Sequence, residues 1–154
     1  MLLPFTDGLM KTTHFDDECR QLADRHYSRR TVGARQFAYS GRKLVLRDVD
    51  GLVLFVWMFP DPAMRMDGQT GYNNAIFRNE SSRRSSEIIL EAEWHAVAKW
   101  GPGRAYTYID PVKVASDNPG YCFKKAGWKN VRRPDGTIWL SGEGKHLLDK
   151  DLTP

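Results

Sequence analysis

Residues 73–128 read NNAIFRNESSRRSSEIILEAEWHAVAKWGPGRAYTYIDPVKVASDNPGYCFKKAGW and carry most of the information about the fold. The apolar pattern predicts a strand over 73–78, a long helix over 85–100 and a second strand over 104–109. A shorter helix is predicted over 118–127. A chain that alternates strand, helix, strand and helix builds a sheet with helices packed on its faces.

The ends of the two helices are marked by residues with capping preferences. Ser85 or Ser86 is predicted to cap the long helix, because a serine hydroxyl accepts a hydrogen bond from a free N–H of the first turn. Asn118 is predicted to cap the shorter helix, with Pro119 at the first helical position, where its missing N–H costs nothing. Gly127 is predicted to end that helix.

A helix and a hairpin are predicted before this segment, and a second hairpin after it. The first helix spans about 16–25, with one of its first two aspartates as the N-cap. Strands over 43–49 and 52–58 flank Asp50-Gly51, a dipeptide typical of a tight hairpin turn. The last hairpin, over 128–141, turns through a Pro-Asp-Gly sequence. The predicted fold class is therefore α/β (α+β), with a central mixed, mostly antiparallel sheet flanked by helices.

Length and composition are those of one globular domain spanning residues 1–154. Hydrophobic residues make up 41% and charged residues 27% of the chain, which excludes a disordered, fibrous or coiled-coil protein. The longest apolar run, 52–59, is far too short to span a membrane. Cys19 and Cys122 form neither a disulfide framework nor a metal-binding motif, and no signal peptide is recognised. We therefore expect a cytoplasmic protein that does not enter a membrane.

The basic residues occur in clusters. The net charge is +4, from 23 basic and 19 acidic residues, and the isoelectric point is about 9.1. Arginine clusters interleaved with aromatic residues suit a polyanion, because phosphates need cations and bases offer faces for stacking. A solvated basic surface is the alternative explanation. The residues predicted to contact nucleic acid are Arg29, Arg30, Arg35, Lys124 and Lys125.

The order of elements and one short motif resemble the GNAT superfamily of N-acyltransferases over about residues 43–140. Residues 118–128, NPGYCFKKAGW, are similar to its N…Y.K.GF element. The resemblance implies that Asn118 contacts an acyl-CoA cofactor such as acetyl-CoA, and that Tyr121 is a general acid. The family's pyrophosphate loop is rich in glycine, whereas residues 78–86, RNESSRRSS, contain none. Another small donor is therefore the alternative to acyl-CoA.

The glycine-free loop still lies where a phosphate would bind. It joins a predicted strand to the start of a helix, where free backbone N–H groups favour an anion. Its serine hydroxyls and arginine side chains supply further donors. The residues predicted to bind the cofactor are Arg78, Asn79, Ser85, Ser86 and Asn118.

A narrower resemblance is to the Mom family, and it rests on five short motifs. These are His26-Tyr27-Ser28-Arg29, Phe77-Arg78-Asn79, Ser86-Glu87, Tyr108-Ile109-Asp110-Pro111 and Asn118-Pro119-Gly120-Tyr121. Mom proteins are phage-encoded, have the GNAT fold and install a carbamoylmethyl group on N6 of adenine in DNA, which protects the DNA from restriction. The resemblance implies an acyltransferase-like DNA modification enzyme. Such an enzyme acts on a flipped adenine of double-stranded DNA in the cytoplasm of the bacterial host.

The residues predicted to be catalytic are His26, Tyr27, Ser28, Asp110 and Tyr121. Asp110, at the end of a strand, would accept a hydrogen bond or proton from the exocyclic amine, and Tyr121 would stabilise the charge that develops. Each has a structural alternative. Asp110 would cap the turn that follows it, His26 would be a satisfied histidine on the apolar face of its helix, and Tyr121 would pack against the fold.

The other titratable residues support weaker hypotheses. No group of residues has the spacing of a zinc site, so a metal ion held by His26 with a neighbouring tyrosine or aspartate has little support. Glu91 or Glu93 is expected to be buried and paired. The two lysines that follow Cys122 are expected to lower the pKa of its thiol.

Two other functions fit the same sequence features. The first is a GNAT N-acetyltransferase that acts on a small amine or a protein, since the fold permits both chemistries. The second is a non-catalytic DNA-binding protein on a degenerate GNAT scaffold, which the missing glycines of residues 79–86 suggest. Salt-sensitive binding to duplex DNA distinguishes the base-modifying enzyme from the amine acetyltransferase.

Overall fold

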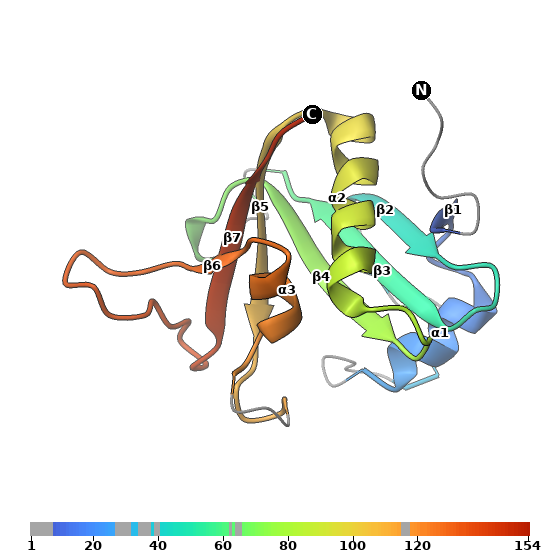
Figure 1. Ribbon diagram of the computed structural model, residues 1–154, viewed down its shortest axis with the longest axis horizontal. Helices are drawn as coiled ribbons and strands as arrows, with labels where there is room; N and C mark the ends of the chain where they lie inside the picture. Colours follow the sequence, from blue (N-terminus) through green and yellow to red (C-terminus); the bar gives the residue numbers. More distant parts are fainter. Residues whose placement is uncertain are drawn as a thin grey trace.

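The computed structural model describes residues 8–26, 32–33, 38, 41–61, 63, 66–114 and 118–154. The strands of this part of the chain are β1 (Met10–Thr12), β2 (Arg42–Arg47), β3 (Val53–Phe59), β4 (Tyr72–Asn79), β5 (Gly103–Ile109), β6 (Lys129–Asn130) and β7 (His146–Leu152). They form one sheet in the order β1-β2-β3-β4-β5-β7-β6 (Figure 1). Neighbouring strands are antiparallel except β4 and β5, which are parallel. The predicted mixed, mostly antiparallel sheet is thus confirmed.

Helices cover both faces of the sheet. Among the described residues, the helices are α1 (Asp17–Asp24), η2 (Met66–Gly68, one turn), α2 (Ser85–Trp100) and α3 (Tyr121–Lys125). Buried residues of α2 and α3 pack in one core with β2, β3, β5 and β7, whereas those of α1 pack in a second core on the other face of β2, β3 and β4. Figure 1 shows α2 lying across the sheet, with α1 near the ends of β3 and β4. The sheet therefore has a helix-covered face on each side.

The predicted hairpin forms from β2 and β3. Val45 pairs with Val56, and every residue of β3 before Phe59 is buried. The Asp48 carboxylate closes the turn by accepting hydrogen bonds from the N–H groups of residues 52 and 53, at 2.8 and 2.9 Å. Gly51 has φ of 72°, and a Cβ there would overlap the carboxylate of Glu18. Glycine is therefore favoured by the backbone conformation, whereas the Glu18 side chain, which is 56% exposed, could move away from an added Cβ.

The two parallel strands separate toward their C-terminal ends. Pairing between β4 and β5 covers only Tyr72–Asn74 with Ala105–Thr107, although both strands continue, and Figure 1 shows them diverging. The Asn74 amide donates to the carbonyl oxygens of Val56 and Ile76, at 3.2 and 3.0 Å. The Thr107 hydroxyl donates to the Asn74 side-chain oxygen at 3.1 Å. These buried polar side chains satisfy one another where the regular ladder ends.

The starts of α2 and α3 differ from the predictions. The N-cap of α2 is Arg84, which makes no capping hydrogen bond, so the prediction of Ser85 or Ser86 was wrong. The Ser85 hydroxyl instead accepts a hydrogen bond from the side-chain amide of Asn79, the last residue of β4. The N-cap of α3 is Gly120 in a left-handed conformation, with φ of 77°. Asn118 therefore lies before the helix and does not cap it.

The last strand was not predicted from the sequence. β7 lies between β5 and β6, and it pairs with both. The hairpin predicted over 128–141 is present, with Arg132 bridged antiparallel to Ile138 and the Trp139 N–H donating to the Val131 carbonyl oxygen at 2.9 Å. Lys129 and Asn130, at its start, also pair with β7. The predicted Pro-Asp-Gly turn is present further along, where the Arg133 N–H donates to the Thr137 carbonyl oxygen at 2.8 Å. The chain between β6 and β7 extends away from the sheet in Figure 1.

Candidate functional site

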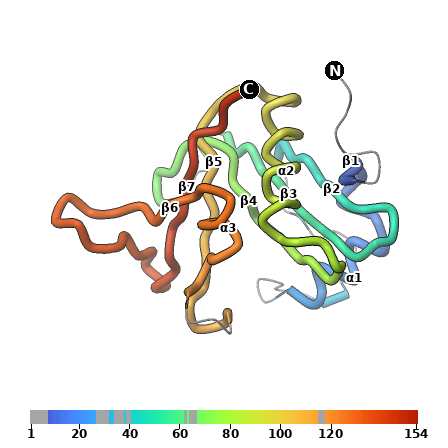
Figure 2. The backbone as a smooth tube through the Cα atoms, viewed as in Figure 1, coloured from blue at the N-terminus to red at the C-terminus, as the bar shows by residue number. Residues whose placement is uncertain are grey.

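Most predicted site residues that the structure describes lie at one end of the sheet. This end contains the C-terminal ends of β4 and β5, the last residues of α1, the first turn of α2 and the start of α3. Figure 2 shows the ends of β4 and β5 along the lower edge of the molecule, with the start of α2 beside β4. In open sheets with parallel strands, ligands bind outside the C-terminal ends of those strands. This end is therefore the candidate functional site.

Arg78 is held in place by an ion-pair network. It is the next-to-last residue of β4, and its Nε donates to the Glu80 carboxylate at 2.9 Å. Arg25, just after α1, donates to both oxygens of the same carboxylate, at 2.7 and 3.0 Å. Hydrogen bonds from Arg25, and then from Arg78, lower the pKa of Glu80 below its usual value. The Glu80 carboxylate therefore links Arg25, at the end of α1, to Arg78, at the end of β4.

His26 lies beside Arg78. Burial, together with the positive charge of Arg78, lowers the pKa of the imidazole to about 4. The side chain is neutral at pH 7 and half-buried at the end of α1. His26 was predicted to be catalytic and Arg78 to bind the cofactor, and the two residues lie near each other in the structure. A neutral imidazole next to a guanidinium can accept a hydrogen bond or donate one.

Asn79 and Ser85 hold the loop between β4 and α2 in shape. The Asn79 amide donates to the Arg83 carbonyl oxygen at 2.8 Å and to the Ser85 hydroxyl at 3.0 Å. Its side-chain oxygen accepts from the N–H and the hydroxyl of Ser81, at 2.9 and 2.6 Å. The side chains of these two predicted cofactor ligands are thus already engaged in hydrogen bonds that shape the β4–α2 connection. Ser86, the third one in this loop, is half-buried in the first turn of α2.

The two arginines of this loop point to different surroundings. Arg83 forms an ion pair at 2.8 Å with Glu91, which is fully buried in α2 and also accepts a hydrogen bond from the Leu9 N–H. Arg84 is exposed and, among the described residues, forms no ion pair. Arg84 is therefore the loop arginine that can reach a ligand.

The expectation that buried glutamates of α2 are paired is confirmed for both Glu91 and Glu93. Glu93 contacts Lys150 of β7 at 2.7 Å and accepts a hydrogen bond from the Trp128 indole at 3.0 Å. Burial raises the pKa of Glu93 above its usual value, although both partners act against this rise. The ion pair ties α2 to the last strand and has a structural role.

Asp110 and Tyr121 stand at the neighbouring ends of β5 and α3. A Cβ at Gly120 would lie 3.3 Å from the Ile109 side chain, so the residues just before Asp110 and Tyr121 are in contact. One oxygen of Asp110 accepts hydrogen bonds from the N–H groups of residues 112 and 113, at 3.0 and 3.4 Å. This is the turn cap that sequence analysis gave as the alternative to catalysis. The second oxygen accepts no hydrogen bond from the described residues.

The other predicted site residues in and just before α3 differ in their exposure and hydrogen bonding. Tyr121 is the first residue of the helix and is 56% exposed, so its hydroxyl is accessible and not packed in the core. The Asn118 side-chain oxygen accepts a hydrogen bond from Lys124 at 2.7 Å, which joins a predicted cofactor ligand to a predicted DNA contact. Lys125 is exposed.

Several predicted residues lie outside the described part of the chain. They are Tyr27, Ser28, Arg29, Arg30 and Arg35. The described residues contain no group of three histidine, cysteine or acidic side chains that could hold a metal ion. Burial raises the pKa of the Cys122 thiol, so the prediction that the following lysines lower it was wrong.

The Arg25–Glu80 ion pair and the Asn74–Thr107 hydrogen bond were not predicted from the sequence. Glu80 lies in a polar stretch after Arg78, and nothing in the sequence sets it apart from its polar neighbours. Only its ion pair with Arg25, at the end of α1, does so. Asn74 and Thr107 are polar residues at buried positions of β4 and β5. A polar residue within a predicted strand is the sequence feature that could have indicated this hydrogen bond.

No protein-family model matches this chain, and the search among curated proteins found no similar sequence. Within the described residues, none of the helices has the length and apolar character needed to cross a membrane.

Proposed function

We propose that this protein is a GNAT-fold enzyme that modifies a base in DNA, at the N6 amine of adenine, in the manner of the Mom family that its motifs resemble. The observation that carries this proposal is the proximity of Arg78, at the end of β4, to His26: Arg78 donates to the carbonyl oxygen of the preceding residue, Arg25, at 3.3 Å, and its charge lowers the pKa of the imidazole. His26 and Arg78 come from two of the motifs on which the resemblance rests.

The parallel pairing of β4 with β5 supports the proposal. α2 connects β4 to β5, and the two strands separate after Asn74. The C-terminal ends of such strands, next to a helix N-terminus, are a general location for ligands that carry phosphate. We therefore assign the donor to the β4–α2 side of the site and the adenine to the β5–α3 side.

The β4–α2 loop fits one phosphate group of a donor. Arg84 is exposed at the N-cap of α2, and the N–H groups of Ser85 and Ser86 make no hydrogen bond within the described residues. These three groups would hold a phosphate of acyl-CoA or of another small donor. When bound, the donor supplies an electrophilic carbon. The absence of glycine from the loop means that its other N–H groups approach a pyrophosphate less closely.

The acceptor side must handle the proton of a weakly nucleophilic amine. Transfer would form a bond from N6 to the transferred carbon and break the bond between that carbon and its carrier, which is the thioester C–S bond if the donor is acyl-CoA. The carrier would leave with the electron pair of the broken bond, and the amine would lose one proton. We assign the second oxygen of Asp110 to accept the hydrogen bond from this amine. The accessible hydroxyl of Tyr121 would donate to the charge that develops. His26, neutral at pH 7, would orient the transferred group through a hydrogen bond.

The substrate in this proposal is double-stranded DNA in the bacterial cytoplasm. The net charge of +4 and the exposed Lys125 at the end of α3 favour contact with phosphates. An adenine inside a duplex is not accessible to a protein side chain, so the base must flip into the site.

Mass spectrometry of nucleosides tests the proposal directly. The chain is expressed in bacteria, and total DNA is digested to nucleosides and compared with DNA from cells that express Asp110→Asn. A deoxyadenosine of increased mass that requires Asp110 supports the proposal. Unmodified deoxyadenosine in cells with abundant folded protein contradicts it.

A second candidate, a DNA-binding protein without catalytic activity, is favoured by one observation. Asn79 and Ser85 bind each other and leave few side-chain groups in the loop for a donor. Salt-sensitive binding of duplex DNA by the purified protein, with no modified nucleoside, supports this candidate.

A further inference from the structure

The chain between β6 and β7 forms a hairpin that projects from the sheet beside β6 (Figure 1 and Figure 2). Arg132 is bridged to Ile138, so these two residues point to the same face of the hairpin. Arg133 and Trp139 each follow a member of this pair and therefore point to the opposite face, the Trp139 face. They are diagonal neighbours across the hairpin, at a separation of about 7–8 Å. One cation and one aromatic ring thus share one face of the hairpin.

The Trp139 ring is held by an aromatic contact with β5. Its centroid lies 6.4 Å from that of the Tyr108 ring. Ile109 packs in the core with α2, so its neighbour Tyr108 points to the other face of the sheet. The Tyr108 hydroxyl donates to the Asp67 carboxylate at 2.9 Å, which fixes the ring that supports Trp139. Trp139 is partly exposed and therefore offers an aromatic surface to a ligand.

This aromatic surface lies close to the acceptor side of the candidate functional site. Asp110 comes two residues after Tyr108, so the Cα atoms of these two residues are at most about 7 Å apart. The Tyr108 ring in turn neighbours the Trp139 ring, and Asp110 is the residue assigned to the amine in the proposed function. A base stacked on Trp139 therefore belongs to the same short stretch of DNA as a base that reaches Asp110.

Arg133 is the cation of the Trp139 face that can contact a phosphate. It is exposed, and among the described residues it takes part in no ion pair with a carboxylate. Hydrogen bonds from Thr137 lower the pKa of the nearby Asp135 below its usual value, and the charge of Arg133 contributes to this shift. On the other face, Arg132 donates to the Gly136 carbonyl oxygen at 2.9 Å. Arg133 therefore keeps its guanidinium N–H groups for a ligand.

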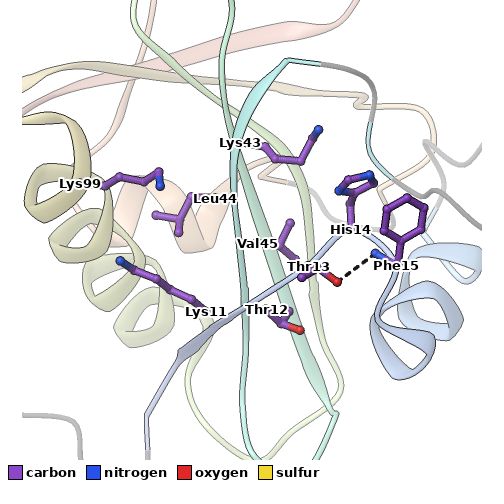
Figure 3. A pocket seen from close by; sticks show the side chains of 9 residues that line it. All are labelled: Lys11, Thr12, Thr13, His14, Phe15, Lys43, Leu44, Val45 and Lys99. Carbon is purple, nitrogen blue, oxygen red and sulfur yellow. Dashed lines mark hydrogen bonds between the residues drawn. The ribbon is translucent and has the colours of Figure 1, made fainter.

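The lysines around a hollow beside β2 offer no comparable arrangement. The hollow has a volume of about 350 Å³. Figure 3 shows the Lys43 side chain on the other side of β2 from Lys11 and Lys99. The Lys99 ammonium group also lies over the Trp100 ring, 5.9 Å from its centroid. These three charges do not converge on one anion, whereas the cation and the ring of the hairpin share one face.

We propose that the Trp139 face binds an unpaired stretch of a DNA strand, with one base stacked on Trp139 and a nearby phosphate bound by Arg133. The inference rests on the proposed function in taking DNA as the ligand. A flipped base leaves such an unpaired stretch in the duplex. An aromatic side chain stacks on the face of any base, and a guanidinium binds a phosphate through parallel N–H groups. The separation of the two side chains corresponds to about two nucleotide steps of 3.4 Å.

Fluorescence anisotropy of a short labelled oligodeoxyadenylate, measured with the full chain at several salt concentrations, tests the proposal. Trp139→Leu should weaken binding about tenfold, because it removes one stacked base, and should leave the slope of log K against log salt concentration unchanged. Arg133→Gln should reduce the magnitude of this slope by about 0.7, the value for one phosphate of a single strand. Trp139→Phe keeps an aromatic face and should bind more tightly than Trp139→Leu.

Two matched controls come from the same chain. Trp94→Leu removes a partly exposed tryptophan of α2, and Arg132→Gln removes the arginine on the other face of the same hairpin. Both variants should bind the oligonucleotide as the unmodified chain does. The melting temperature of each variant checks its folding.

Three results would each overturn the proposal. They are no binding of the oligonucleotide by the unmodified chain, equal affinities of Trp139→Leu and Trp94→Leu, and equal changes of slope in Arg132→Gln and Arg133→Gln. The nucleoside assay separates this inference from the proposed function. Modified deoxyadenosine together with binding that does not depend on Trp139 rejects only the hairpin site. Binding that depends on Trp139, without a modified nucleoside, supports the hairpin site and contradicts the proposed function.

Discussion

The N-cap of α1 provides the sharpest test of how the site is held, because α1 leads directly to His26. The Asp16 carboxylate accepts hydrogen bonds from the Cys19 N–H at 3.0 Å and the Thr12 hydroxyl at 2.7 Å. Arg47 of β2 donates to both oxygens, at 3.2 and 3.0 Å. We expect Asp16→Asn to retain the cap, since asparagine is an equally good N-cap residue, and to lose the ion pair with Arg47.

The size of the effect follows from the pKa of Asp16. Burial raises this pKa, but hydrogen bonds from Thr12, Cys19 and Arg47 outweigh burial, and the pKa falls from 3.8 to about 2. A shift of this size corresponds to about 2 kcal/mol of stability. The pKa of Asp16 in the folded state lies below its unfolded value of 3.8. The ionised carboxylate therefore stabilises the fold at pH values above 3.8, and this stabilisation is lost as the pH falls toward 2.

Urea unfolding at several pH values, followed by tryptophan fluorescence, measures this contribution. Asp16→Asn should lower the free energy of unfolding by about 2 kcal/mol at pH 7, and the difference from the unmodified chain should shrink toward zero near the folded-state pKa. Asp17→Asn is the control, because Asp17 is 85% exposed and 3.8 Å from Arg20, and its effect should stay below about 0.5 kcal/mol. Equal effects of the two variants at pH 7, or a difference that does not change with pH, would refute the reasoning.

Four further predictions concern the candidate site. Arg78→Ala should reduce base-modifying activity far more than Arg132→Ala in the extended chain after β6, and equal losses in a nucleoside assay would make the β4–α2 loop a mere surface. The imidazole of His26 should titrate at about 4 in a nuclear magnetic resonance pH series, and Arg78→Ala should move this value upward, because one of the two causes of the shift is removed. Asp110→Asn should leave the melting temperature unchanged, since asparagine also caps a turn, but abolish modification, while Tyr121→Phe should slow it by about two to three orders of magnitude. Near-normal activity of Asp110→Asn would end its catalytic assignment. A charge-reversed variant should lose duplex binding in a gel-shift assay, with unchanged thermal stability as the check on folding. That variant replaces by glutamate the arginines of the first basic loop, Arg29, Arg30 and Arg35.

The charged residues of β7 explain why this strand was missed. Asp149 and Lys150 interrupt its apolar pattern, but Asp149 pairs with Arg104 at 2.9 Å and Lys150 with Glu93 at 2.7 Å. Both partners come from elements far away in the chain. These ion pairs offset the partial burial of the two charges in the sheet, and sequence periodicity carries no information about their partners.

The sequence by itself determined the elements whose cause is local. The apolar pattern predicted α2 to within a residue, Asp50-Gly51 marked the β2–β3 turn, and Gly127, with φ of 98°, ends the helical segment after Tyr121. These features depend on residues within a few positions of one another. Tertiary structure alone decided the place of β7 in the sheet, the inward turn of Arg83 to Glu91, and the meeting of His26 with Arg78. Each of these depends on burial and on charge pairs between segments distant in the chain, whose energies exist only once the segments have packed together.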